Sequence, residues 1–382
     1  MKQLLVDVSI ICRNDAGTGI QRVVRALFQE LLAEPPTGFN IRPVCATRRS
    51  GYRYADEYCT RVSGEAIQES DLGLNISVNA GDIFLGLDFS SRILPRRQTE
   101  LLRWRARGVK SMFIVYDLLP ALRPDWFTRP GAKAYKSWLT TLAMHADHLL
   151  CISASVKCDL ELWLRKKYRL TDSEIRTGWF HLGADLRGND DAGSLPACVA
   201  LPSTCRFPTV LMVGTVEPRK GHEQVLDAFE LLWRAGNEAR LVIVGKPGWH
   251  VDELMKRLDC HPESGQRIIW LKSANDVTLT SHYKCADGLL MASYGEGFGL
   301  PLVEAAIHGM PVLARDLPVF REVAQGHVTY FSADDAGQMA AILRTWFSAL
   351  TEGTAPNSGR IPLQSWRQSA AQLRNCLLDV NF

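Results

Sequence analysis

The feature that most constrains the fold is a repeated alternation of short apolar runs with amphipathic runs. The run LLVDVSII is followed by IQRVVRALFQELLAE, whose apolar residues recur at helical spacing. Further strand-like runs are FNIRPVCA, DIFLGLD, VKSMFIVYD, DHLLCIS and GWFHLGAD, with helix-like runs between the later ones. Strands that alternate with helices predict a parallel sheet covered on both faces, and therefore an α/β fold.

The alternation stops once and then starts again. Residues 186–208 are rich in Gly, Pro, Ser and Asp, which is typical of a linker. The chain has 382 residues, above the size at which a single core usually divides. We therefore predict two doubly wound, Rossmann-like domains facing a central cleft, an N-terminal one over 1–190 and a C-terminal one over 205–350. A last amphipathic run over 363–382 follows a loop rich in Pro and Gly.

The charge and the apolar runs limit the class of protein. A net charge of +3 is too small to indicate a nucleic-acid-binding protein. The segment 92–136 holds eleven Lys and Arg against three Asp and Glu, together with Trp104 and Trp126. It is either a patch for an anionic surface or a set of scattered solvated side chains. No run of about 18 apolar residues occurs, so we expect no membrane-spanning helix.

The cysteines and histidines indicate reduced thiols and no metal. The ten cysteines show no CxxC spacing and several lie in apolar runs, which favours a cytoplasmic protein. The start MKQLLVDVSIIC has an Asp inside a short apolar run, which predicts a first strand and not a signal peptide. His145 and His148 form an HxxH pair, but no third ligand follows at useful spacing, so we expect no metal site.

Two loops of the C-terminal domain carry charges just after a strand. After VLMVG comes TVEPRKGHEQ, in which Arg219 and Lys220 precede a helix. Two cations there suit a phosphate or diphosphate, and a solvated surface turn is the alternative. After DGLLMAS comes YGEGFGLPLVEAA, in which Glu296 and Glu304 flank a turn with Gly297 and Gly299. These glycines allow backbone N–H groups to approach a ligand.

The N-terminal domain has a loop of its own, RNDAGTGIQRVVR. Gly17, Thr18 and Gly19 form a turn at a helix start, and Arg22 follows one turn later. The loop could hold an anion, and a tight turn between a strand and a helix explains it equally well.

These motifs resemble the group 1 (GT4) retaining glycosyltransferases of the GT-B fold. The resemblance rests on GTVEPRKGHEQVLDAF and YGEGFGLPLVEAAIHGMPVLA, is strong over 209–332, and is looser over 1–30 and 113–185. It implies a nucleotide-sugar donor in the C-terminal domain, an acceptor on the N-terminal domain, and no metal or other cofactor. It also implies that the last helix returns to the N-terminal domain.

The resemblance implies roles for individual residues. Glu304 would bind the ribose hydroxyls, and Arg219 and Lys220 would neutralise the diphosphate as it leaves. Glu296 would hold the donor sugar. The donor-binding set also includes Gly19, which would approach the phosphate, and the following residues: Arg22, Gly297, Phe298, Gly299, Leu300. Fixed cations and a carboxylate assist because breaking a sugar–phosphate bond develops opposite charges on the diphosphate and the sugar.

The sequence departs from the family pattern at two places. Many relatives carry a His-containing motif where this chain has VYDLLP, with Asp117. Asp117 is a candidate catalytic residue that would contact the donor or the acceptor. His181 stands where relatives often have Asn.

The prediction for function is a retaining glycosyltransferase. The runs TGIQRVVR and YDLLP resemble bacterial mannosyl- and deoxyhexosyltransferases of O-antigen or exopolysaccharide assembly, which implies GDP-mannose or a GDP-deoxyhexose as donor. The implied acceptor is a lipid-linked or growing polysaccharide, with peripheral contact at the inner face of the cytoplasmic membrane. The alternatives are a UDP-sugar donor, a nucleotide-sugar epimerase and a non-catalytic nucleotide-sugar binder.

Overall fold

The computed structural model describes residues 1–63, 76–171, 174–184 and 207–378, which form two compact units. Unit 1 comprises Met1–Pro124, Arg129–Gly183 and Gln364–Phe382. Unit 2 comprises Asp125–Thr128 and Ala184–Leu363. The predicted linker over 186–208 lies almost wholly outside the described residues.

Unit 1 is built on a sheet that, over the described residues, has seven strands in the order β3-β2-β1-β4-β5-β6-β7. Neighbouring strands are parallel except for the antiparallel pair β2 and β3. The strands are β1 (Lys2–Asp7), β2 (Phe39–Cys45), β3 (Arg53–Tyr54), β4 (Ile83–Gly86), β5 (Lys110–Val115), β6 (His148–Cys151) and β7 (Arg176–Trp179).

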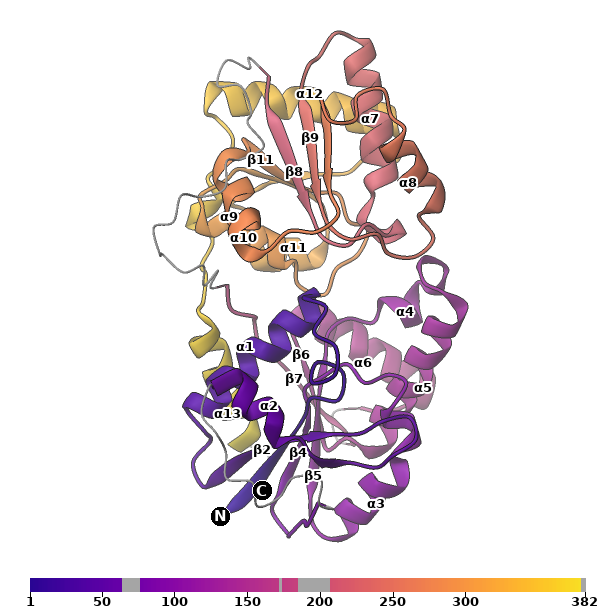
Figure 1. Ribbon diagram of the computed structural model, residues 1–382, viewed down its shortest axis with the longest axis vertical. Helices are drawn as coiled ribbons and strands as arrows, with labels where there is room; N and C mark the ends of the chain where they lie inside the picture. The colour runs from indigo at the N-terminus through magenta and orange to yellow at the C-terminus, as the bar shows by residue number, and fades with distance from the viewer. Residues whose placement is uncertain (64–75, 172–173, 185–206, 379–382) are drawn as a thin grey trace. The chain divides into compact units, whose positions relative to one another are not determined.

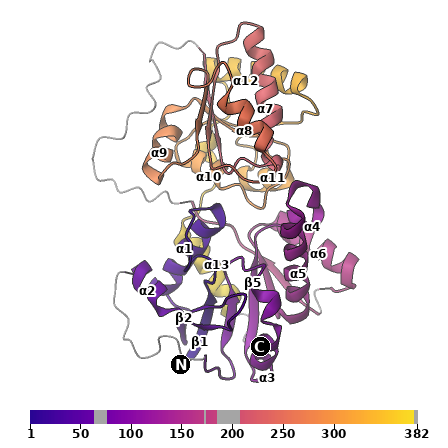
Figure 2. The ribbon, with the colours of Figure 1, turned by 45° about the vertical axis from the view of Figure 1, so that its right-hand side comes forward.

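Helices cover both faces of this sheet, which explains why the central strands β1 and β4 are buried along most of their length. The α-helices are α1 (Gly19–Ala33), α2 (Asp56–Ser63), α3 (Gln98–Ala106), α4 (Leu119–Leu122), α5 (Arg129–His145), α6 (Ala154–Tyr168) and α13 (Trp366–Leu378). Short 3₁₀ turns are η2 (Leu94–Arg96) and η3 (Pro124–Trp126). Within the unit, α1, α2 and α13 lie on one side of the sheet, and α5 and α6 lie on the other (Figure 1; Figure 2).

Unit 2 repeats this arrangement with an all-parallel sheet in the order β10-β9-β8-β11-β12-β13. The strands are β8 (Thr209–Val213), β9 (Arg240–Val244), β10 (Ile268–Leu271), β11 (Gly288–Met291), β12 (Val312–Arg315) and β13 (Thr329–Phe331). The helices are η4 (Pro218–Lys220), α7 (His222–Arg234), α8 (Asp252–Asp259), α9 (Asp276–Cys285), α10 (Leu300–Ile307), α11 (Pro318–Ala324), α12 (Ala336–Glu352) and η5 (Ser358–Arg360). Within the unit, α7 and α8 lie on one side of the sheet and α9 and α10 on the other (Figure 2).

Trp104 is not part of the anionic-surface patch that the sequence suggested for the segment 92–136. Trp104 is only 6% exposed. Its ring lies 5.4 Å from the rings of Tyr52 and Phe84, measured between centroids. The expectation that Trp104 rests on a surface is therefore wrong, because the apolar face of α3 turns it into the core of unit 1. Within the described ranges, no helix combines the length and the hydropathy needed to cross a bilayer.

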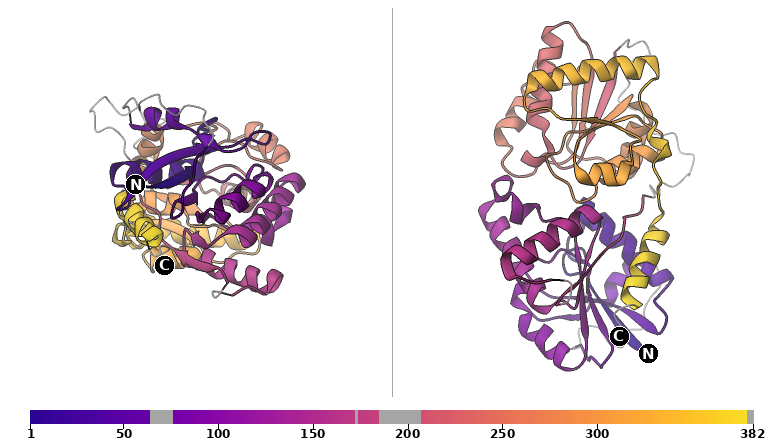
Figure 3. Two further views of the ribbon diagram at one scale, coloured as in Figure 1. Left: turned by 90° about the horizontal axis from the view of Figure 1, so that it is seen from below. Right: turned by 180° about the vertical axis from the view of Figure 1, so that it is seen from behind.

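The last helix, α13, belongs to unit 1 and packs alongside α1 (Figure 3). Arg374 Nη2 lies 2.8 Å from Glu34 Oε2, just past the end of α1. Ser369 Oγ donates to the carbonyl of His181 at 2.7 Å. Gly183 lies against the backbone at Trp366, so a side chain at position 183 would collide with the start of the helix. The apolar face of α13 thus completes one side of the sheet of unit 1.

We predict that Leu373→Ala destabilises unit 1. Leu373 is fully buried on α13, and truncating a buried leucine costs about 2–5 kcal/mol of unfolding free energy. Chemical denaturation measures the loss, and hydrogen–deuterium exchange should locate it in α1. Asn375→Ala, at an exposed position of the same helix, serves as the control and should change stability by less than about 0.5 kcal/mol. Equal losses in the two variants would contradict the packing of α13.

Candidate functional site

Two charged loops of unit 2 meet because the strands that precede them are neighbours. β8 pairs with β11, with Leu289 opposite Leu211, and both strands run parallel, so their carboxyl ends lie at one edge of the sheet. The N–H of Tyr294 donates to the carbonyl of Arg219 at 2.7 Å. A Cβ at Gly221 would lie 2.6 Å from the carbonyl oxygen of Ala292, so only glycine permits this approach of the loops. The loops after β8 and β11 therefore form one structure.

The two loops are joined by Glu296. Its Oε2 lies 2.8 Å from Arg219 Nη1, and its Oε1 lies 2.5 Å from Lys220 Nζ. Ser293 Oγ donates to the same Oε1 at 2.7 Å. Arg219 Nη1 also donates to the carbonyl of Gly295 at 3.0 Å. The structure thus brings together three of the residues predicted from the sequence: Arg219, Lys220 and Glu296.

Two opposing effects act on the ionisation of Glu296. Burial would by itself raise the pKa of its carboxyl, but the charges of Arg219 and Lys220, with hydrogen bonds from Lys220 and Ser293, lower it to about 2. Glu296 is therefore a carboxylate at all physiological pH values. A fixed negative charge in this loop can stabilise positive charge that develops on a bound group.

The sequence prediction missed the second carboxylate at this site. Arg219 Nε lies 2.7 Å from Oε1 of Glu217, which is 3% exposed. The two cations, Arg219 and Lys220, are thus matched by two glutamates, the buried Glu217 and the largely covered Glu296. The sequence did contain a signal for this contact. Glu217 stands two residues before Arg219, at the start of a 3₁₀ turn, and residues so close together in a turn can form an ion pair.

The turn before α10 requires glycine at position 299. Gly299 has a φ of 96°, and a Cβ there would lie 2.8 Å from the ring of Phe320. Only glycine fits this position, because its φ is positive and a side chain would meet Phe320. Phe298 is buried, and Gly297 and Leu300 complete the segment. The N-terminal end of α10, with its partial positive charge, therefore follows Glu296 closely along the chain.

Glu304 lies on α10, one turn after its start. It is buried, and the Tyr283 hydroxyl on α9 donates to its Oε2 at 2.7 Å. The tyrosine fixes the direction of the carboxylate, which the sequence did not reveal because α9 is distant from α10 along the chain. Glu296 and Glu304 thus lie in the same unit but have different partners: Glu296 pairs with Arg219 and Lys220, and Glu304 accepts from Tyr283.

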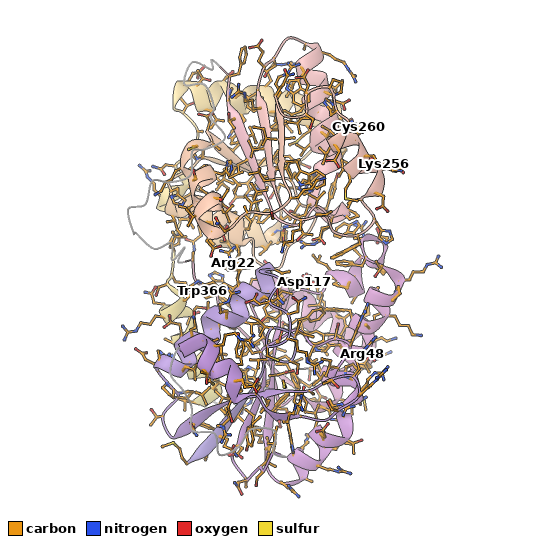
Figure 4. The ribbon with its side chains drawn as sticks, in the orientation of Figure 1. Arg22, Arg48, Asp117, Lys256, Cys260 and Trp366 are labelled. Carbon is orange, nitrogen blue, oxygen red and sulfur yellow. The ribbon has the colours of Figure 1, made fainter. Side chains whose placement is uncertain are left out.

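The remaining predicted residues belong to unit 1. Thr18 caps α1 together with Gln21 in a capping box, so α1 begins at Gly19. Arg22 follows in the first turn of the helix. Asp117 comes just after β5, and its Oδ1 accepts from the N–H of Leu119 at 3.0 Å. Arg22 and Asp117 both lie at the end of unit 1 where its parallel strands end (Figure 4). His181 supports α13 through its carbonyl, as described above.

Comparison with known proteins identifies related proteins. Residues 203–353 match the sequence profile described as "Glycosyl transferases group 1". The serotype-specific mannosyltransferase WbdA of Escherichia coli is 38% identical over 373 residues, which is 97% of this chain and 44% of the relative. Over residues 203–353 the chain is similar to the group 1 glycosyltransferases, and over almost its whole length it is similar to a mannosyltransferase. The resemblance inferred from the two loop motifs is thereby confirmed.

Other relatives match smaller parts of this chain. The O-antigen chain mannosyltransferase RfbU of Salmonella typhimurium is 32% identical over 237 residues, covering 62% of this chain and 58% of the relative. This chain spans less than half the length of WbdA and just over half the length of RfbU.

Solved structures of other proteins confirm the fold of this chain. A glycosyltransferase from Rickettsia africae aligns with a TM-score of 0.61 at 15% identity, covering 100% of this chain and 96% of that one. Sucrose-phosphate synthase from Thermosynechococcus elongatus aligns with a TM-score of 0.64 at 16% identity, covering 100% and 99%. The predicted class, α/β with two parallel-sheet units of the GT-B fold, is confirmed.

We predict that the stabilising effect of Glu296 fades in acid. Its pKa in the folded protein, about 2, lies below the ordinary 4.5, so ionised Glu296 adds stability above pH 4.5 that is lost as the pH falls toward 2. Linkage puts this loss at about 1.4 kcal/mol between pH 7 and pH 3.5. Glu296→Gln lacks the contribution, so the difference in unfolding free energy between wild type and variant should shrink by that amount. Denaturant titrations at the two pH values measure it, and a constant difference would contradict the assignment.

Proposed function

We propose that this chain is a retaining glycosyltransferase that transfers mannose or a deoxyhexose from a GDP-sugar to a lipid-linked or growing polysaccharide. The observation that carries the proposal is Glu296 held between Arg219 and Lys220 at the carboxyl edge of β8 and β11. The choice of sugar is supported by the names of the relatives, which include a serotype-specific mannosyltransferase and an O-antigen chain mannosyltransferase.

The cations are proposed to stabilise the leaving diphosphate. As the sugar–phosphate bond breaks, negative charge develops on the phosphate oxygens, and Arg219 and Lys220 are placed to donate to them. The backbone N–H groups at the start of α10 add partial positive charge. Because these groups supply the charge that a metal ion supplies elsewhere, the proposed reaction needs no metal and no other cofactor.

The two glutamates are proposed to hold opposite ends of the donor. Glu296, with the amides of 297–300, would bind the sugar and stabilise the positive charge that grows on its ring. Glu304, whose direction Tyr283 fixes, would bind the ribose hydroxyls. For Gly19, Arg22 and Asp117 in unit 1, the proposal keeps the roles implied by the family: Gly19 and Arg22 toward the donor, and Asp117 toward the donor or the acceptor.

A nucleotide panel followed by a transfer assay tests the proposal. In buffer with EDTA, GDP should raise the melting temperature more than UDP, ADP or dTDP, since a ligand at a hundred times its Kd adds about 2.7 kcal/mol. GDP-mannose and octyl α-mannoside should then give a disaccharide whose new linkage keeps the anomeric configuration of the donor, as read by NMR. Selective binding of UDP would move the donor to a UDP-sugar. Loss of transfer in EDTA that Mn²⁺ restores would contradict the cation argument.

Matched variants separate catalysis from binding in the same assay. Arg219→Ala should lower kcat by about 10²–10³, as expected for the loss of one charged donor in the transition state. Lys256→Ala removes a lysine that is 71% exposed on α8 of the same unit (Figure 4) and should leave kcat unchanged. Nucleotide binding without transfer to octyl α-mannoside or to a lipid-linked mannoside would favour a non-catalytic binder.

The proposal includes a cytoplasmic site of action and peripheral contact with an anionic membrane. The described cysteines are free thiols, which supports a reducing compartment. On α3, Leu102 is 54% exposed, and it is flanked by the exposed side chains of Arg103 and Arg105. An exposed leucine among arginines is the combination that binds anionic lipid surfaces.

We predict that the chain sediments with vesicles of phosphatidylcholine and phosphatidylglycerol, and less with phosphatidylcholine alone. Arg103→Glu with Arg105→Glu should lower the partition coefficient at least about tenfold, because each basic residue contributes about 1 kcal/mol. The charge-matched control, Lys256→Glu with Lys272→Glu, reverses two exposed lysines of unit 2 and should have no such effect. Equal effects of the two double variants would mean that binding depends on the net charge of the protein and not on a contact made by α3.

A further inference from the structure

Arg315 is a buried cation beside the charged loops of unit 2. It ends β12, the strand next to β11, and is 8% exposed. Its Nε donates to the carbonyl of Ala292 at 3.1 Å, and its Nη1 donates to the carbonyl of Ala333 at 3.1 Å. Its Nη2 donates to Gln224 Oε1 at 2.6 Å. The guanidinium is thus fixed by three neutral oxygens.

No carboxylate pairs with Arg315 among the residues that the structure describes. Its guanidinium carbon lies 4.3 Å from the ring centroid of Tyr294 and 5.0 Å from that of Phe331. Burial lowers its pKa, and the negative charge of Asp334 acts in the opposite direction. A buried cation without an ion pair is unfavourable, and a nearby anion would offset that cost.

The other charges of the site cancel. Arg219 and Lys220 carry two positive charges, and Glu217 and Glu296 carry two negative charges, all within 2.5–2.8 Å contacts. Summed over these four side chains the charge is zero. Arg315 adds one positive charge that is not part of this paired group.

Arg315 is also coupled to the position of the loop that bears Glu296. Ala292, whose carbonyl it binds, is followed directly by Ser293, which donates to Glu296. The Tyr294 hydroxyl donates at 3.0 Å to the same Gln224 oxygen that accepts from Arg315. Arg315 therefore connects the start of this loop to α7, the helix that follows Arg219 and Lys220.

We propose that Arg315 is a positioning residue of the donor site and that its charge makes the site select nucleoside diphosphates over uncharged nucleosides. This inference rests on the proposed function, because it assumes that the loops after β8 and β11 bind the diphosphate. Arg315 acts through the loop, because it fixes the Ala292 carbonyl. It also adds a positive potential, whereas the charges of Arg219 and Lys220 are offset by the glutamates that pair with them.

Calorimetric titration of GDP and guanosine into wild type and three variants tests the inference. For Arg315→Gln we expect GDP affinity to fall about tenfold or more and guanosine affinity to change by less than about twofold, since a Coulomb effect acts only on the charged ligand. Arg315→Lys keeps the charge and should keep the ratio of the two affinities within about twofold of wild type. The control, Arg321→Gln, removes an arginine of unit 2 that is 58% exposed and should change neither affinity.

The outcomes separate this inference from the proposed function. If wild type binds neither GDP nor UDP, the proposed function fails. If wild type binds and Arg315→Gln weakens GDP and guanosine equally, Arg315 is only structural and the inference is overturned. If Arg315→Gln does not fold, Arg315→Lys decides. A preserved ratio of GDP affinity to guanosine affinity supports the role of the charge, and a tenfold lower ratio overturns the inference. If the wild type prefers UDP, the same comparison is made with UDP and uridine.

Discussion

The Glu296 carboxylate, held between Arg219 and Lys220, is the interaction on which the candidate site depends. It joins two loops that are distant along the chain and follow adjacent strands of one sheet. Burial of a carboxylate is unfavourable unless charges and hydrogen bonds compensate it, and both are present here. Each partner therefore fixes the others, and the loops are held in one arrangement.

This pairing shapes how an anionic ligand would bind. Because Arg219 and Lys220 already contact glutamates, a diphosphate would compete with Glu217 and Glu296 for them or share them. Arg315, whose guanidinium is bound by neutral oxygens and lies over two aromatic rings, adds a positive charge outside these ion pairs. A site of this kind can hold its cations in place while the additional charge sets its preference for anions.

The comparison with relatives places this chemistry in one part of longer proteins. The family profile covers the region that contains all of the charged loop residues of unit 2. The chain spans less than half of WbdA. The geometry described here therefore concerns a chain that spans only part of such a relative, and its acceptor and its sugar are proposals.

The sequence by itself determined the class of fold and the location of the charged loops. Alternating strand and helix patterns specify an α/β sheet covered on both faces, and Arg219, Lys220 and Glu296 each follow an apolar strand. Tertiary structure decided which residues meet, because the order of the strands in a sheet differs from their order along the chain. Only the adjacency of β8, β11 and β12 brings Glu296 to the two cations and places Arg315 behind them. Likewise, Trp104 looked exposed in a basic segment, and packing against Tyr52 and Phe84 buried it, because core formation depends on which faces the folded helices present.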